Sequence, residues 1–184
     1  MRRTVCSVAL TFLLLAGCTS SRVFVDRDQS CDHPVRMIAI DPESGAWGDA
    51  VAEAITRNCG IKTRSRESTA RLTEDLWIGR SYLLRRENMR AFASNGIDAY
   101  LFGGACWRLP DGRPLHASVY LRDTYTGRPF LSVRWHARGR PGACGRCYPS
   151  DRNNPTEFDA PAREVAAALC DRLRKINKRQ GPQN

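Results

Sequence analysis

The clearest hydrophobic pattern in the chain is an alternation in its second half. Every second residue is apolar between 115 and 122, and the same alternation returns between 131 and 137. Strict alternation is typical of a strand with one buried face. A third apolar stretch, 99–107, precedes them, and turn residues separate the three at Pro110-Asp111-Gly112 and at 123–127. The pattern therefore predicts three consecutive antiparallel strands that share one core-facing side.

Shorter patterns in the first half predict helices and two more strands. The apolar run 35–40 indicates a buried strand, and apolar residues then recur at helical spacing from Trp47 to Ile55. Gly60 stands where a glycine would end that helix. A brief strand is expected around 61–63 and a helix over 87–94, whereas residues 65–85 are ambiguous, with possible helical turns around Thr73–Trp77.

The final helix is expected to start near Asp159. Its buried face is marked by apolar residues at helical spacing: Ala166, Leu169, Cys170, Leu173 and Ile176. The complete set of elements predicts an α+β domain, with a mixed, largely antiparallel sheet and helices packed mainly on one face.

The N-terminus has the features of a secretory signal. Arg2 and Arg3 precede an apolar stretch that is too short to span a bilayer. It ends in Leu15-Ala16-Gly17-Cys18, which resembles the lipobox of bacterial lipoproteins. That resemblance implies cleavage before Cys18 and a covalent lipid on its thiol; apart from this lipid we expect no cofactor. Thr19 stands where an Asp would retain the protein in the inner membrane, which favours an outer membrane anchor facing the periplasm.

These signals divide the chain into four parts. We expect a signal peptide at 1–17, a lipidated tether at 18–34, one folded domain at 35–177 and a disordered basic tail at 178–184. The whole chain has a net charge of +10, of which the signal peptide carries two positive charges. Such a charge favours anionic partners, and nucleic acid fits the charge but not the expected compartment.

The cysteines indicate disulfides rather than free thiols. Eight cysteines are present, and six remain when Cys6 and Cys18 are set aside. An even number in an oxidising compartment is typical of a disulfide-bonded domain. The candidates are Cys31, Cys59, Cys106, Cys144, Cys147 and Cys170.

The order of the elements suggests some of the pairings. Cys31 and Cys59 should lie at the same edge of the domain, so we prefer a bond between them. Cys106 is expected to reach Cys144 or Cys147 in the long loop 139–158, with a local Cys144–Cys147 bond as the rival. Cys170 is either a core thiol or the remaining partner.

Catalytic and metal sites find little support in the sequence. Cys144-Gly145-Arg146-Cys147 has redox spacing, but no helix follows it to stabilise a thiolate. A zinc site there would need further ligands. His116 and His136 are the nearest candidates and would approach each other if their strands pair, but we can place no carboxylate ligand beside them. We therefore expect no metal, no catalytic residue and no enzyme activity.

Two local motifs resemble a group of envelope proteins. Gly96-Ile97-Asp98-Ala99-Tyr100-Leu101-Phe102-Gly103-Gly104 enters a strand, and Leu121-Arg122-Asp123-Thr124-Tyr125-Thr126-Gly127 forms a hairpin turn. In the turn, Asp123 is placed to accept hydrogen bonds from amides, and Gly127 to take a positive φ. With the element order, these motifs resemble the N-terminal domain of TolB and the periplasmic domains of CsgG-type and PelC-type lipoproteins. The resemblance implies binding and assembly rather than catalysis, with ring formation as one arrangement.

Three functional hypotheses follow. The leading one is an outer-membrane lipoprotein, anchored by its lipid, that serves as a subunit or accessory factor of an envelope export or assembly complex and can form homo-oligomers. The alternative is a periplasmic binder or activator whose basic surface docks an anionic cell-wall polymer or a synthase. The third is a thiol–disulfide protein that uses Cys144 and Cys147.

Overall fold

The computed structural model describes residues 21–29, 31–107, 114–137 and 158–180. Within them a six-stranded sheet has the order β1-β6-β5-β4-β2-β3. Its strands are β1 (Arg22–Asp28), β2 (Met37–Ile40), β3 (Lys62–Arg64), β4 (Ala99–Trp107), β5 (Pro114–Asp123) and β6 (Pro129–His136). The helices are α2 (Gly45–Cys59), α3 (Arg66–Asp75), α4 (Arg86–Ser94) and α5 (Asp159–Arg179), with short 3₁₀ turns η1 (Pro42–Ser44) and η2 (Arg80–Tyr82).

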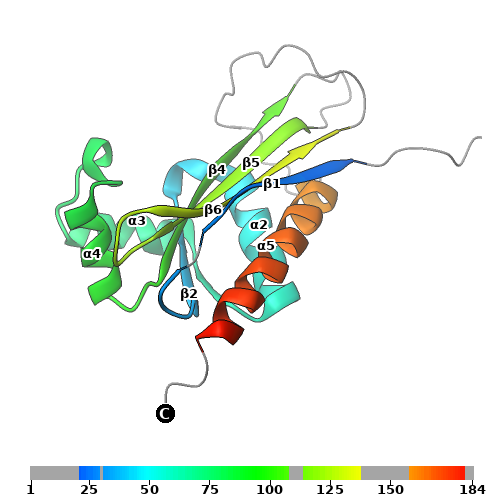
Figure 1. Cartoon of the computed structure of the whole chain (residues 1–184). Coiled ribbons are helices and arrows are strands. Elements are labelled where there is room, and N and C mark those ends of the chain that lie inside the picture. Colours follow the sequence, from blue (N-terminus) through cyan, green and yellow to red (C-terminus); the bar gives the residue numbers. More distant parts are fainter. Residues whose placement is uncertain (1–20, 30, 108–113, 138–157, 181–184) are drawn as a thin grey trace, which may run out of the picture.

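The sheet is mixed, as the sequence predicts. Strands β4, β5 and β6 form an antiparallel meander, and β2 pairs in parallel with both β3 and β4. Parallel neighbours need a crossover between them. Helix α2 connects β2 to β3, and the segment containing α3 and α4 connects β3 to β4 (Figure 1).

The main core lies between one face of the sheet and the helices α2 and α5. The alternating apolar residues of the meander, among them Val119, Leu121 and Val133, point into it and are fully buried. Trp47 of α2 and Leu169 of α5 meet them from the helix side. The predicted α+β architecture, with the longer helices on one face, is confirmed.

The opposite face carries a smaller core at one end. Leu72 of α3 and Met89 and Phe92 of α4 pack against Tyr100 of β4. Figure 1 shows α3 and α4 grouped at that end of the molecule. The segment 65–85, which the sequence left open, thus contains a helix, whose N-cap Ser65 accepts a hydrogen bond from the Ser68 amide.

Part of the predicted tether belongs to the sheet. Residues 22–28 form the edge strand β1, which pairs antiparallel with β6, and Val23 and Val25 pack against the main core. Arg134 of β6 holds both carboxylate oxygens of Asp26. The folded domain therefore includes residues 22–28, which the sequence pattern assigned to the lipidated tether 18–34. At the other end, α5 continues to Arg179, two residues into the predicted tail.

The disulfide between Cys59 and Cys170 corrects a sequence prediction. Cys59 ends α2 and bonds to Cys170 of the adjacent helix α5, so the preferred Cys31–Cys59 bond is wrong. Helix α5 packs beside α2 and brings Cys170 to Cys59. Cys31 is a free, buried thiol. Cys106 is disulfide-bonded, and its predicted partners Cys144 and Cys147 lie outside the described residues.

Two further predictions concern parts of the chain that the structure does not describe. The lipid acceptor Cys18 and nearly all of the loop 139–158 lie outside the described ranges. Among the described helices, no stretch has the length and apolar character needed to cross a bilayer.

Candidate functional site

A polar network surrounds Asp123 at the turn between β5 and β6. Its Oδ1 accepts hydrogen bonds from the amides of Tyr125, at 2.8 Å, and Thr126, at 3.3 Å. The Thr126 hydroxyl donates to Oδ2 at 2.9 Å, and Gly127 has a φ of 70°. This is the turn geometry that the sequence motif predicts for Asp123 and Gly127.

The turn is also fixed to the start of two neighbouring strands. The Thr124 hydroxyl lies 2.5 Å from the carbonyl oxygen of Ile97 and 2.9 Å from that of Asp98. The Asp98 carboxylate accepts hydrogen bonds from the amides of Arg36 and Met37 at 2.8 and 2.9 Å. The first motif and the hairpin motif therefore meet in space, and together they position the beginnings of β2 and β4.

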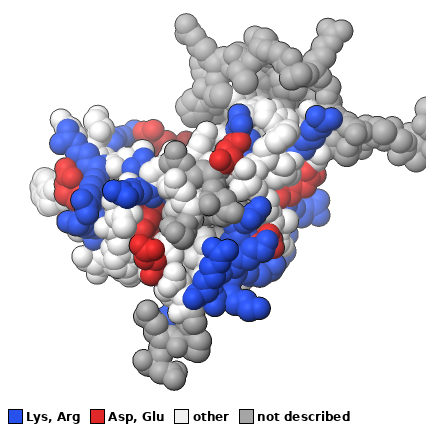
Figure 2. Space-filling view, in the orientation of Figure 1, with Lys and Arg blue, Asp and Glu red and all other residues white. Residues whose placement is uncertain are grey.

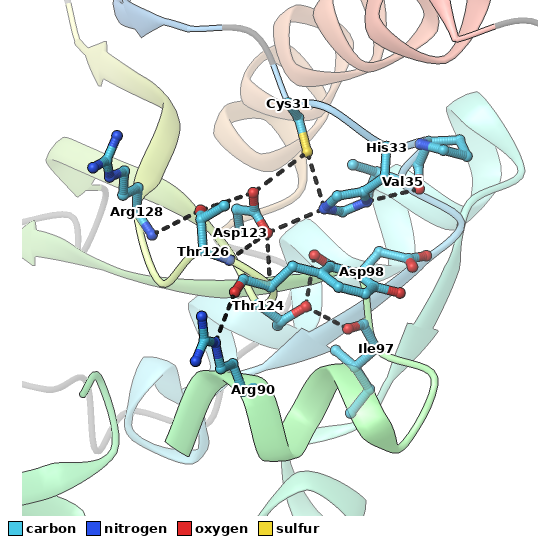
Figure 3. A network of polar contacts seen from close by, with 12 residues as sticks. Cys31, His33, Val35, Arg90, Ile97, Asp98, Asp123, Thr124, Thr126 and Arg128 are labelled. Carbon is cyan, nitrogen blue, oxygen red and sulfur yellow. Dashed lines mark hydrogen bonds and ion pairs between the residues drawn. The ribbon is translucent and has the colours of Figure 1, made fainter. Parts of the chain in front are cut away.

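Cys31 and His33 approach Asp123 from the segment between β1 and β2 (Figure 3). The Sγ atom of Cys31 lies 3.3 Å from Nε2 of His33 and 3.9 Å from Oδ2 of Asp123. The same His33 nitrogen lies 3.1 Å from Oδ1 of Asp123. Sequence reasoning missed this cluster, because Asp123 is about ninety residues from its two partners along the chain.

The end of α5 holds the segment in place. The side-chain amide of Asn177 accepts a hydrogen bond from the Val35 amide at 2.7 Å and donates one to the Val35 carbonyl oxygen at 2.9 Å. The Gln180 side chain donates to the carbonyl oxygen of Cys31 at 2.9 Å. Cys31 and His33 therefore lie on backbone that both α5 and the hairpin constrain.

The cluster shifts the ionisation of its members in opposite directions. Burial opposes a charge on His33, but the hydrogen bond to Asp123, together with Cys31, raises the pKa of His33 to about 10. Burial would raise the pKa of Asp123, yet hydrogen bonds from His33 and Thr126 and from the turn amides lower it. Near neutral pH, His33 and Asp123 therefore form an ion pair.

The geometry differs from that of a nucleophilic triad. In such a triad the nucleophile and the carboxylate contact different ring nitrogens of the histidine. Here both Cys31 and Asp123 face Nε2, and Nδ1 lies 3.3 Å from the Pro34 carbonyl oxygen. Cys31 is also only 2% exposed. The cluster therefore suits ion pairing or ligand binding better than attack on a substrate.

His116 and His136 lie side by side on the polar face of β5 and β6, as the sequence predicts for paired strands. They are directly paired in register, and their Nδ1 atoms are 3.3 Å apart. Burial, His136 and Arg134 all lower the pKa of His116. In the described part of the chain, only Cys31, His33 and Asp123 form a group of three or more metal-ligating side chains, so the strand histidines have no third ligand there.

Three large apolar side chains in the segment between α3 and α4 are exposed. Trp77 is 95% exposed, Tyr82 is half exposed, and Leu84 is also exposed; we call these three residues the Trp77 surface. Trp77 has a φ of 55°, a left-handed backbone conformation that is rare for an aromatic residue. Arg85 stacks over the Tyr82 ring at 4.1 Å.

A cavity of about 320 Å³ lies next to the Trp77 surface. Its walls combine apolar side chains such as Leu83 and Phe102 with the carboxylates of Asp41, Glu43 and Glu74. Asp41 accepts a hydrogen bond from the Tyr100 hydroxyl at 2.9 Å. Burial raises the pKa of Asp41, and the same cause, with the nearby Asp41 charge, raises that of Tyr100.

Comparison with known proteins finds similarity only among solved structures. No protein-family model matches the chain, and no curated protein matches it. A PelC dodecamer from Paraburkholderia phytofirmans is 16% identical, with a TM-score of 0.47, over 84% of this chain and 97% of that one. A single-residue variant of the same dodecamer gives 16% identity and a TM-score of 0.45, over 85% and 98%. PelC-type lipoproteins are among the groups that the sequence motifs resemble.

Proposed function

We propose that the chain is a lipid-anchored outer-membrane protein, facing the periplasm, that serves as a non-enzymatic subunit or accessory factor of an envelope export or assembly complex. The lipobox ending at Cys18 supports the anchor. Only three residues separate Cys18 from β1, and four residue steps span at most about 14 Å. The lipid would therefore hold the edge of the sheet close to the bilayer.

The observation that carries the proposed docking role is the exposure of Trp77. Burial of an aromatic side chain is one of the larger favourable terms in association, and tryptophan is enriched among residues that dominate binding energy. A tryptophan that is 95% exposed contributes almost none of this to the isolated fold. Figure 1 places α3 and α4 at the end of the molecule away from the start of β1. The Trp77 surface is thus presented to a protein partner on the side away from the anchor.

Self-association of the delipidated protein tests the docking role. We expect the wild-type chain to form a closed oligomer in native mass spectrometry, and Trp77→Ala to weaken it by about tenfold or more. Phe24→Ala is the matched control, because Phe24 is also an exposed aromatic residue but lies on β1. A strict monomer at high concentration would refute a role as a self-assembling subunit, and equal assembly of the Trp77→Ala variant would refute docking through Trp77.

Acylation is tested separately in intact cells. Labelled palmitate should enter the wild-type chain and be absent from Cys18→Ser. Globomycin should make the uncleaved precursor accumulate. If the wild-type chain takes up no label, the proposed lipid anchor is refuted. The proposed location at the outer membrane then has no support.

A second candidate function rests on the basic end of α5. Lys and Arg side chains gather over this helix in Figure 2. The exposed basic residues there include Arg174, Lys175, Lys178 and Arg179. Such a patch attracts anionic polymers, and the attraction weakens with salt. The test is salt-sensitive retention on peptidoglycan or lipopolysaccharide, which Lys178→Glu with Arg179→Glu should abolish. Retention that neither salt nor these substitutions reduce would exclude this candidate.

A further inference from the structure

Cys31, His33 and Asp123 place three different metal-binding atoms around one point. The thiol sulfur, the imidazole nitrogen and a carboxylate oxygen all lie within 4.8 Å of one another. From this arrangement we infer that the three residues bind a divalent transition metal ion of the zinc type. The inference stands independently of the Trp77 surface and of the lipid anchor.

The separations of the three atoms match a tetrahedral zinc site. Bonds of about 2.3 Å to sulfur, about 2.0–2.1 Å to nitrogen and about 2.0–2.2 Å to oxygen place neighbouring ligand atoms about 3.3–3.6 Å apart. Here Nε2 of His33 lies 3.3 Å from Sγ of Cys31 and 3.1 Å from Oδ1 of Asp123, and Sγ lies 3.9 Å from the other carboxylate oxygen, Oδ2. Because one carboxylate oxygen lies within 4.8 Å of both Sγ and Nε2, a rotation of the Asp123 carboxylate would bring the three ligand atoms around the ion.

The surroundings of the ligands have the second layer of hydrogen bonds that metal sites use. A metal-binding histidine usually donates its other ring N–H to a carbonyl or carboxylate oxygen. Nδ1 of His33 lies 3.3 Å from the Pro34 carbonyl oxygen, so Nδ1 keeps its proton when a metal ion displaces the proton on Nε2. Asp123 is oriented by the Tyr125 and Thr126 amides and by the Thr126 hydroxyl. Both ligands are thus already aimed at the centre of the cluster.

Charge and access also suit a divalent ion. Metal binding displaces the thiol proton of Cys31 and the Nε2 proton of His33 into solvent, and the resulting thiolate, the carboxylate and the neutral imidazole together balance a divalent cation in a buried place. Thiolate with imidazole selects zinc, or another borderline transition metal, over magnesium or calcium. The His33 side chain is 21% exposed, whereas that of Asp123 is 6% exposed. Ion and water therefore reach the cluster from the His33 side, where water completes the fourth position.

Cobalt substitution provides a direct readout. The purified full-length protein, with its native disulfides, is titrated with Co²⁺ and then with Zn²⁺ under anaerobic conditions. We expect one Co²⁺ per chain, with a thiolate-to-cobalt charge-transfer band and the visible bands of a tetrahedral site, and displacement by one Zn²⁺. The charge-transfer band identifies sulfur as a ligand, which hydrogen bonding alone does not produce.

Three variants distinguish the site from other metal binding. His33→Gln should weaken Zn²⁺ binding by more than about 100-fold, since even outer partners of metal ligands contribute about 10–100-fold. Cys31→Ser should lose the charge-transfer band. His116→Gln with His136→Gln is the matched control, because these histidines also lie close together, and it should bind as the wild type does.

Circular dichroism of each apo variant checks that it is folded. The inference is overturned if the folded wild type, with Cys31 shown to be a free thiol by labelling after denaturation, takes up no Co²⁺. It is equally overturned if the double histidine variant loses the ion while His33→Gln retains it, or if Cys31 is found in a disulfide.

Discussion

Trp77 occupies a backbone position that helices normally give to glycine. The Trp77 amide donates to the Glu74 carbonyl oxygen at 3.0 Å, and the Ile78 amide donates to that of Thr73 at 2.9 Å. These two bonds define the Schellman motif, in which the left-handed residue after the helix is usually glycine. Helix α4 ends in the same way with Gly96, which has a φ of 73°. Helix α3 thus keeps a strained tryptophan where the same protein uses glycine elsewhere.

Replacement of Trp77 by glycine should therefore stabilise the fold. The left-handed conformation costs an L-residue about 1–2 kcal/mol, part of which glycine loses again through its greater freedom in the unfolded chain. Because Trp77 is 95% exposed, little burial is lost. We expect Trp77→Gly to raise the free energy of unfolding by about 0.5–1 kcal/mol in urea titrations.

The Trp77→Ala variant separates the effect of backbone strain from the effect of losing the exposed ring, since alanine removes the aromatic ring but keeps the strained backbone. This variant should show no gain in stability. If Trp77→Gly is less stable than the wild type, the indole contributes to the stability of the isolated fold. The strain at Trp77 would then no longer indicate that the side chain is retained for binding.

At this scale the sequence predicts local chemistry well and distant contacts poorly. Asp123 and Gly127 belong to a turn that five consecutive residues define, so their roles follow from residue type and spacing. Cys31 and His33 come from another part of the chain, and only the fold brings them to Asp123. The even number of cysteines and the order of the elements favoured a disulfide for Cys31, but neither shows that Cys170 is the sulfur that reaches Cys59.

At the scale of elements, the Cys59–Cys170 bond joins two helices that cover the same face of the sheet. The bond closes a chain segment of 111 residues, and a cross-link over such a length restricts the unfolded chain strongly. The double variant Cys59→Ala with Cys170→Ala should lose about 2–5 kcal/mol of stability in urea titrations. Cys31→Ala is the control for loss of a buried sulfur, because Cys31 is a free thiol. A double variant no less stable than this control would show that the bond contributes nothing.

The histidine pair of β5 and β6 should make the hairpin sensitive to acid. Burial and the neighbouring His136 lower the pKa of His116 from 6.5, so the folded state binds a proton there less readily than the unfolded chain. The contribution of His116 to the free energy of unfolding is therefore fully present above pH 6.5, and it is lost as the pH falls below this value. His116→Gln should reduce the fall in melting temperature between about pH 8 and about pH 5. Identical pH profiles for variant and wild type would contradict this assignment.

The elements that the sequence predicted are those whose apolar residues recur at a regular spacing. Strands β5 and β6 alternate apolar and polar residues, and they pair antiparallel with their apolar residues in the core, as expected. Helix α3 buries only Thr69 and Leu72, which leaves too few apolar positions to reveal a helical period. Strand β1 has a short apolar core of three residues among polar ones, and its bulge between Val25 and Arg27 interrupts the alternation.

At the scale of the whole molecule, the first strand links the proposed anchor to the sheet. Strand β1 lies at the edge of the sheet and pairs with β6 alone. A lipid on Cys18 would therefore pull on the sheet itself and would limit how the domain turns relative to the bilayer. The bidentate contact between Arg134 and Asp26 adds a side-chain link between the two strands.

Removal of this strand should damage the domain and not merely shorten it. A chain that begins at Ser30 loses the backbone pairing with β6 and the packing of Val23 and Val25. It also exposes an unpaired strand edge, which favours aggregation. Relative to a chain that begins at Thr19, we expect a loss of about 2–4 kcal/mol in urea titrations, and soluble aggregates in size-exclusion chromatography. Asp26→Asn is the control, because loss of an exposed ion pair costs at most about 1 kcal/mol. If the chain beginning at Ser30 stays monomeric and equally stable, β1 is dispensable for the fold. The lipid would then hold the domain through a flexible linker instead of through its sheet.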